Sequence, residues 1–278
     1  MTASAYKDLY LNLRVPVVDE TGKRIGTEPV RIDQYLLAER RPNLEKTLDH
    51  LMGPLRNHFK KPGSTLTVFV GTGQVSEKLF RSWGDAWYFA KKPLWGKGSP
   101  EEAQIALQLA LRFKVVNTTS ELQQYCDDNV GLDCNGFVGN YLEHGYRGKP
   151  WDSDKVGADF VANQGVRDLM GKLGPEVKSI NDLEITETYV MGIVDPQTKQ
   201  VINKGTFPNI AHTVVTTPLM FVGMFDGKPS VTMQVVESTG FVGLTESTYF
   251  LLSGANHVFS IWRTSKKEKR QFRLRPVR

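Results

Sequence analysis

Residues 131–142 read GLDCNGFVGNYL and contain one of the two cysteines of the chain. Four apolar side chains repeat there with the spacing of one helical face: Phe137, Val138, Tyr141 and Leu142. Asp133 is a residue type that caps helix N-termini, so the pattern predicts a short helix with Cys134 in its first turn. Unpaired backbone N–H groups and the helix dipole favour a thiolate at that place. Taken alone, however, such a cysteine is more often a small buried side chain than a nucleophile.

The composition is that of an ordinary globular chain. Its 278 residues are 40% hydrophobic and 23% charged, which is ample for a core in one large domain or two modest ones. No apolar run approaches the ~20 residues of a membrane helix, so we expect no membrane span. The start, MTASAYKDLYLNLRVPV, lacks the basic and apolar regions of a conventional signal peptide, which predicts synthesis in the cytoplasm. Two cysteines make no disulfide framework, and we expect both thiols to be free.

The positive charge of the chain gathers at its end. The net charge is +5, and residues 263–278, RTSKKEKRQFRLRPVR, hold eight of the 35 basic residues. Such a cluster is compatible with nucleic acid, anionic lipid or an acidic wall polymer. Phe272 and Leu274 alternate with Arg273 and Arg275, which instead favours a terminal β-hairpin with a solvated turn at residues 266–269. We therefore predict no nucleic-acid partner.

The order of elements indicates an α+β fold. Hairpin strands are predicted at residues 11–18 and 28–32, a buried strand at 66–70, and an aromatic-rich helix through Phe80, Trp83 and Phe89. Ser99 and Pro100 mark a helix start, and residues 154–173 read as one or two further helices. From residue 185 onward strands dominate, at 188–194, 210–216, 219–225 and 231–237, with edge strands at 249–252 and 258–262.

A thiolate nucleophile needs a general base, and histidine has the suitable pKa near pH 7. The chain has five candidates: His50, His58, His144, His212 and His257. Only His212 lies inside an apolar strand, and only His212 is followed by a hairpin that ends in an acid, Glu237. A strand histidine by itself is usually structural, so it is the order of these residues that carries information.

The segment LDCNGFVGNYL resembles the nucleophile segment of the NlpC-like and CHAP-type cysteine peptidases and amidases, which have a papain-like fold. IAHTVVT resembles their histidine strand, and VTMQVVEST resembles the strand that carries the residue orienting the histidine. The resemblance covers about residues 120–240. Asn135 replaces the usual serine, the expected upstream glycine pair is absent, and the spacings from Cys134 to His212 and from His212 to Glu237 are long.

The resemblance implies a papain-like fold, with helices first and an antiparallel sheet after the nucleophile helix. It implies a catalytic triad of Cys134, His212 and Glu237, with Gln234 as a substitute for Glu237. The Cys134 backbone N–H, with a side chain such as Gln124 or Tyr125, would hold the oxyanion. No cofactor is implied, and no cysteine–histidine cluster has zinc spacing.

The implied activity is cleavage of a peptide or amide bond, above all in bacterial peptidoglycan. An enzyme of this kind without a signal peptide can reach the wall through a phage-type lysis route, or through a dedicated secretion machine as an antibacterial effector with an immunity partner. Two alternatives stay open: an acyltransferase or deamidase acting on protein or lipid, and a binding module with a dead site. The hydrolase domain is predicted over residues 116–278, and residues 1–115 form an accessory or integrated N-terminal region.

Overall fold

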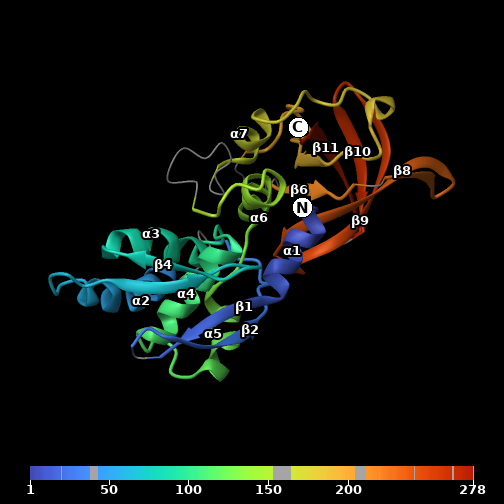
Figure 1. Cartoon of the computed structure of the whole chain (residues 1–278). Helices are drawn as coiled ribbons and strands as arrows, with labels where there is room; N and C mark the ends of the chain where they lie inside the picture. Colours follow the sequence, from blue (N-terminus) through green and yellow to red (C-terminus); the bar gives the residue numbers. More distant parts are fainter. Residues whose placement is uncertain are drawn as a thin grey trace. The chain divides into compact units, whose positions relative to one another are not determined.

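The computed structural model describes residues 1–19, 21–37, 43–152, 164–203, 211–218, 220–240, 242–264 and 266–277. The chain forms two compact units, one made of residues 8–133 and the other of residues 1–7 with 134–278 (Figure 1). The units divide between Asp133 and Cys134, whereas the sequence predicts a boundary near residue 115. The first seven residues belong with the later unit, because helix α1 (Ala3–Leu11) places Tyr6 against Phe137 and Tyr141.

The unit of residues 8–133 combines two hairpins with helices. Its elements are β1 (Leu13–Val18), β2 (Arg24–Val30), α2 (Leu44–His58), β3 (Leu66–Val70), β4 (Ser76–Phe80), α3 (Trp83–Leu94), α4 (Pro100–Arg112), the 3-10 turn η2 (Thr119–Glu121) and α5 (Leu122–Asn129). β1 pairs antiparallel with β2, and β3 pairs antiparallel with β4.

Local signals predicted most of these elements. The first hairpin and the strand at residues 66–70 are confirmed. The start of α4 is also confirmed, because the Ser99 hydroxyl accepts the Glu102 N–H while the Glu102 carboxylate accepts the Ser99 N–H. The prediction of a helix through Phe80 is wrong: Phe80 ends β4, and α3 begins after Ser82, whose side chain accepts the Asp85 N–H.

The unit of residues 134–278 is a barrel with a few short helices. The helices are α6 (Cys134–Asn140), which continues as the π-helical turn η3 (Tyr141–Tyr146), then α7 (Val166–Gly171) and the 3-10 turn η5 (Ile180–Asp182). The strands are β5 (Tyr189–Ile193), β6 (Thr213–Thr216), β7 (Phe221–Phe225), β8 (Lys228–Thr239), β9 (Gly243–Ala255), β10 (Val258–Arg263) and β11 (Glu268–Pro276). Of the helices predicted at 154–173, residues 154–163 lie outside the described residues, as do residues 210 and 219 of two predicted strands.

Six strands of this unit close into an antiparallel barrel in the order β6, β5, β11, β10, β9, β8 and back to β6. Closure depends on the length of β8, which pairs with β7 along residues 228–232 and with β6 at Val235 and Val236. The α+β class therefore holds, but the prediction of a papain-like fold is wrong, because the sheet closes on itself. The predicted edge strands are likewise wrong, since β9 and β10 each have partners on both sides.

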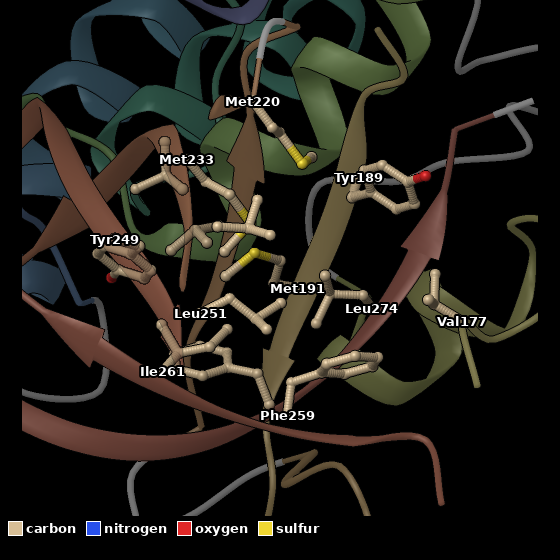
Figure 2. Packing of buried hydrophobic residues seen from close by; sticks show 14 of the residues in the cluster. Val177, Tyr189, Met191, Met220, Met233, Tyr249, Leu251, Phe259, Ile261 and Leu274 are labelled. Atoms are coloured by element: carbon tan, nitrogen blue, oxygen red, sulfur yellow. The ribbon is translucent and has the colours of Figure 1, made fainter. Parts of the chain in front are cut away.

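The inward-facing side chains of the barrel form one apolar core (Figure 2). Alternate residues of each strand contribute to it, as expected for a sheet with one buried face. Members of this core include Tyr189, Met191, Val214, Met233, Val235, Tyr249, Leu251, Phe259, Ile261, Phe272 and Leu274. No helix of the described chain combines the length and apolar character that crossing a membrane requires.

Candidate active site at one end of the barrel

At one end of the barrel the inward-facing rows change from apolar to polar side chains. On β8 the row runs from Met233 and Val235 to Glu237, and on β10 it ends at Arg263. His212 directly precedes β6, whose Val214 belongs to the core. Because neighbouring strands run in opposite directions, the end of β8, the end of β10 and the start of β6 lie at the same end of the barrel.

Strand pairing brings His212 and Glu237 together. β6 pairs with β8 through Val215 and Val236, and continuing this register places Glu237 diagonally across from His212. The His212 carbonyl oxygen accepts a hydrogen bond from the Ile193 N–H at 3.0 Å, which ties this residue to β5. Its Nε2 lies 3.1 Å from Oε2 of Glu237. The two residues that the sequence predicts as base and orienting acid are therefore in direct contact.

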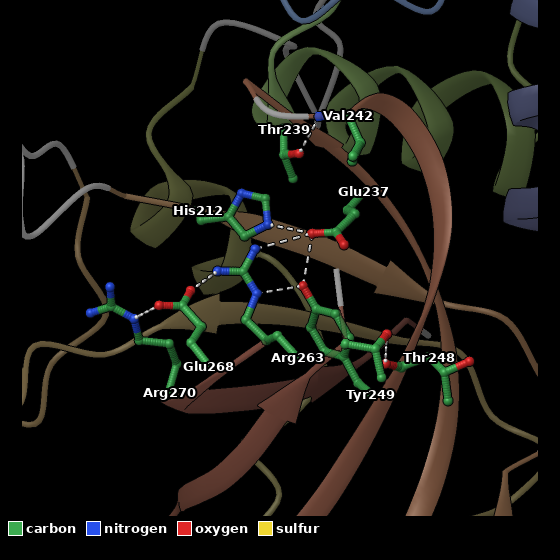
Figure 3. Close-up of polar contacts among 10 residues, drawn as sticks. His212, Glu237, Thr239, Val242, Thr248, Tyr249, Arg263, Glu268 and Arg270 are labelled. Carbon is green, nitrogen blue, oxygen red and sulfur yellow. Dashed lines mark hydrogen bonds and ion pairs between the residues drawn. The ribbon is translucent and has the colours of Figure 1, made fainter. Parts of the chain in front are cut away.

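Glu237 is the centre of a buried polar network (Figure 3). Its side chain is 0% exposed, and Oε2 accepts hydrogen bonds from the Tyr249 hydroxyl at 2.8 Å and from Arg263 Nη2 at 3.2 Å. Arg263 Nε donates to the Tyr249 oxygen at 2.8 Å. A buried carboxylate is stable only when charge and hydrogen bonds compensate for lost water, and this network supplies both.

The network shifts the pKa values of its members. Burial lowers the pKa of His212, an effect that Glu237 opposes and Arg263 reinforces, so the imidazole is neutral near pH 7. Burial also raises the pKa of Tyr249 well above its ordinary value, so its phenol keeps its proton and donates. For Arg263, burial works against the charged form, but Tyr249 and Glu237 offset it and leave the pKa raised.

Cys134 begins α6, as predicted, and Asp133 occupies the residue before the helix. The Asp133 carboxylate forms an ion pair with Lys97. Cys134 is 7% exposed, and its Sγ lies 3.6 Å from Oδ1 of Asn135. Helix α6 packs against β6 and β8, the strands that position His212 and Glu237. No hydrogen bond between this sulfur and His212 is found among the described residues.

The other polar residues named from the sequence have different partners. Gln234, the substitute for Glu237, alternates to the opposite face of β8, where its Oε1 accepts a hydrogen bond from the Thr248 hydroxyl at 3.2 Å. The Gln124 amide donates to Asp128 on its own helix at 3.1 Å. Of the two candidates for orienting His212, it is therefore Glu237 that contacts the imidazole.

Sequence reasoning missed Tyr249 and Arg263. One signal was present in the sequence: Phe259, Ile261 and Arg263 alternate, so a charged residue ends an inward apolar row. A charge at such a position needs a buried partner of opposite sign. The sequence alone does not say that the partner is Glu237, because that contact depends on the pairing of β8 with β9 and of β9 with β10.

Within the described residues, no group of three or more histidine, cysteine, aspartate or glutamate side chains is arranged to hold a metal ion. Comparisons with protein-family models, with curated proteins and with solved structures find no match to this chain.

Proposed function

We propose that the protein is a cysteine hydrolase of peptide or amide bonds. In this proposal Cys134 is the nucleophile, His212 is the general base and Glu237 orients the imidazole. The observation that carries it is the buried 3.1 Å contact between His212 Nε2 and Glu237 Oε2, on the two strands against which the Cys134 helix packs. A carboxylate that orients a histidine, together with a cysteine from a helix packed on the same strands, supplies the parts of a nucleophilic triad.

The hydrogen bond to Glu237 determines which ring nitrogen of His212 can act as the base. An ionised carboxylate only accepts hydrogen bonds, so the Nε2 that contacts Glu237 carries the proton. The neutral ring then has its lone pair on Nδ1, which is the nitrogen available to take a proton from a thiol. Because burial lowers the pKa of His212, the ring is in this neutral form near pH 7.

The reaction follows as two acyl-transfer steps. His212 Nδ1 takes the Cys134 proton, and the thiolate attacks the carbonyl carbon to form a carbon–sulfur bond. The imidazolium returns this proton to the leaving nitrogen as the carbon–nitrogen bond breaks, which releases the amine and leaves a thioester. His212 then deprotonates a water that attacks the thioester. The carbon–sulfur bond breaks, the acid leaves, and the proton returns to the Cys134 sulfur.

Peptidoglycan is the proposed substrate because of the segments around Cys134, His212 and Glu237, which resemble those of NlpC-like and CHAP-type enzymes. The closed barrel gives this choice no further support, so the substrate rests on these short segments alone. The chemistry of the triad and the identity of the substrate therefore need separate tests.

The test of the chemistry is the pH dependence of Cys134 alkylation by iodoacetamide, followed by mass spectrometry. We expect the His212→Ala variant to lose the neutral-pH reactivity of wild type and to react only as an ordinary thiol, with a pKa of about 8.5. The same profile in both proteins would contradict the triad. Cys134→Ala controls for labelling at Cys126, the second cysteine.

The test of the substrate is digestion of purified peptidoglycan, with the released fragments separated by chromatography. We expect wild type to release fragments that Cys134→Ala does not, and identical products from the two would exclude the peptidoglycan hydrolase. Alkylation that depends on His212 without any fragment release would instead retain the thiol chemistry and point to another acyl group, as in a transferase or a deamidase.

A further inference from the structure

One oxygen of Glu237 receives hydrogen bonds from three different parts of the barrel. Oε2 lies 3.1 Å from His212 Nε2, 2.8 Å from the Tyr249 hydroxyl and 3.2 Å from Arg263 Nη2. Two of these donors can carry positive charge, and a buried carboxylate requires one cation to balance it. The question for catalysis is which of the two, His212 or Arg263, provides that charge.

The geometry of Arg263 answers this question. Its side chain is 5% exposed, and each of its three nitrogens has a partner: Nη2 binds Glu237, Nε binds Tyr249 at 2.8 Å, and Nη1 binds Glu268 at 2.8 Å. The second oxygen of Glu268 accepts a hydrogen bond from Arg270 Nε at 2.9 Å. The guanidinium is thus fixed on all sides, and it is always charged.

The four side chains joined by these ion pairs balance in charge without His212. Glu237 and Glu268 contribute two negative charges, and Arg263 and Arg270 contribute two positive charges. Glu268 and Arg270 are partly exposed, so Glu237 and Arg263 are the buried pair. An imidazolium at His212 would place a second positive charge beside the one carboxylate of that pair. Figure 3 shows His212 at the edge of this chain of contacts, joined to it through Glu237 alone.

We propose that Arg263 is a positioning residue for His212: it balances and fixes Glu237, so that His212 remains neutral, with its proton on Nε2 and its lone pair on Nδ1. This inference rests on the proposed function, because only a base needs that form of the ring. It assigns no contact with substrate to Arg263. Its role is carried entirely through Glu237.

The groups that act on His212 come from several elements. Burial has the largest effect and lowers its pKa, Glu237 on β8 raises it, and Arg263 at the end of β10 and Lys266 in the following turn lower it further. Helix α6, which packs on β6, contains one titratable side chain, Cys134. Without Arg263, His212 is the donor that can carry positive charge among the remaining hydrogen bonds to Glu237 described above. We then expect the His212 pKa to rise and the ring to be an imidazolium at neutral pH.

The experiment is NMR of the histidine ring nitrogens, which distinguishes imidazolium from each neutral tautomer. The chain has five histidines, and the His212 signals are assigned by their loss in His212→Ala. In wild type at pH 7 we expect the neutral form protonated at Nε2. Arg263→Met is expected to give the imidazolium, and Arg263→Lys, which keeps the charge, is expected to restore the neutral ring. Arg273→Met is the matched control, because Arg273 on β11 pairs with Glu176 instead.

The same variants predict an effect on hydrolysis. We expect Arg263→Met to lower kcat/KM at neutral pH by about 10²-fold, as the loss of a general base does, with the acid limb of the pH profile moved upward. Arg263→Lys should recover most of this loss in kcat/KM. If Arg263 were only structural, Arg263→Met and Arg263→Lys would both lose stability, and each would lose activity in proportion.

The outcomes separate this inference from the proposed function. An imidazolium at His212 in folded wild type at pH 7 overturns the inference, even if Arg263→Met does not fold. A neutral ring in folded Arg263→Met also overturns it. By contrast, if His212→Ala leaves the alkylation profile of Cys134 unchanged, the proposed function fails, and the positioning role of Arg263 fails with it whatever the NMR spectra show.

Discussion

The middle of the barrel and its polar end, at Glu237 and Arg263, are built from the same strands but held together by different forces. In the middle, residues such as Met233, Leu251 and Ile261 fill the interior with apolar side chains. At the end, Glu237 and Arg263 continue the same inward rows with charged side chains. Apolar contacts are non-directional, so the middle tolerates changes that keep volume. Charged hydrogen bonds are directional, so the end has one satisfactory arrangement.

This difference means that a small change at the end should cost more than a small change in the middle. Removal of one partner from a buried charge pair leaves the other charge without compensation, which is expensive. Removal of one methylene from an apolar core costs only the lost contacts and a small cavity. The predictions below test this difference, beginning with the largest expected effect.

Replacement of Glu237 by alanine should have the largest effect. It leaves the guanidinium of Arg263 without its most buried partner and His212 without its acceptor. We expect the free energy of unfolding to fall by about 3–5 kcal/mol, measured by urea denaturation. Glu176→Ala is the control, since Glu176 also pairs with arginines but is 18% exposed, and it should cost much less.

A double-mutant cycle checks the cause of this loss. If the cost of Glu237→Ala comes from the stranded charge of Arg263, then Glu237→Ala with Arg263→Ala should cost less than the sum of the two single changes. Strict additivity would mean that the two residues are not coupled. The polar end would then respond to substitution in the same way as the apolar middle.

The sequence allowed the middle of the barrel to be predicted better than its closure. Apolar alternation and the Asp226–Gly227 turn placed β7 and β8, and the alternation of Phe272 and Leu274 placed the last hairpin. Closure depends on β6 pairing with β8 as well as with β5. Nothing local in TVVT specifies that second partner. The papain-like fold implied by the resemblance around Cys134, His212 and Glu237 is wrong, because short segments do not fix how the sheet closes.

For a similar reason, the sequence pointed to His212 and Glu237 but not to the side chains that surround them. His212 and Glu237 were found because each lies in an apolar strand and because they follow Cys134 in a familiar order. Tyr249 and Arg263 contact Glu237 only through the registers of β8 with β9 and of β9 with β10. Those registers are long-range properties of the barrel, so neighbouring sequence does not reveal them.

The Tyr249→Phe substitution tests the polar network at the end of the barrel and disturbs it less than Glu237→Ala does, because it removes no charge. It keeps the ring in the core and removes only the hydroxyl that joins Arg263 Nε to Glu237 Oε2. We expect a loss of about 1–3 kcal/mol in unfolding free energy, because a buried N–H of Arg263 is left without an acceptor. A loss of unfolding free energy below about 1 kcal/mol would show that water or another group replaces the hydroxyl as the acceptor for Arg263.

The pH dependence of stability should also differ between the two regions. The His212 pKa in the folded protein lies below its ordinary value of 6.5, mainly because the ring is buried. Below pH 6.5 the unfolded chain therefore binds this proton more readily than the folded protein does. The contribution of His212 is complete above that pH and is lost progressively as the pH falls below it. Urea denaturation from pH 7.5 to 5 should show a steeper loss for wild type than for His212→Gln; the reverse order would mean that His212 is charged in the folded state.

The smallest effect is expected for Ile261→Val in the middle of the barrel. Ile261 is two residues from Arg263 on β10, is fully buried and has only apolar requirements. Loss of one methylene should cost about 0.5–1.5 kcal/mol and leave the alkylation profile of Cys134 unchanged. Because the two side chains share a strand and a face, any change in that profile would mean that packing in the middle is transmitted to the polar end. The two regions would then act as one cooperative structure, and the orientation of His212 would depend on the core as well as on Glu237.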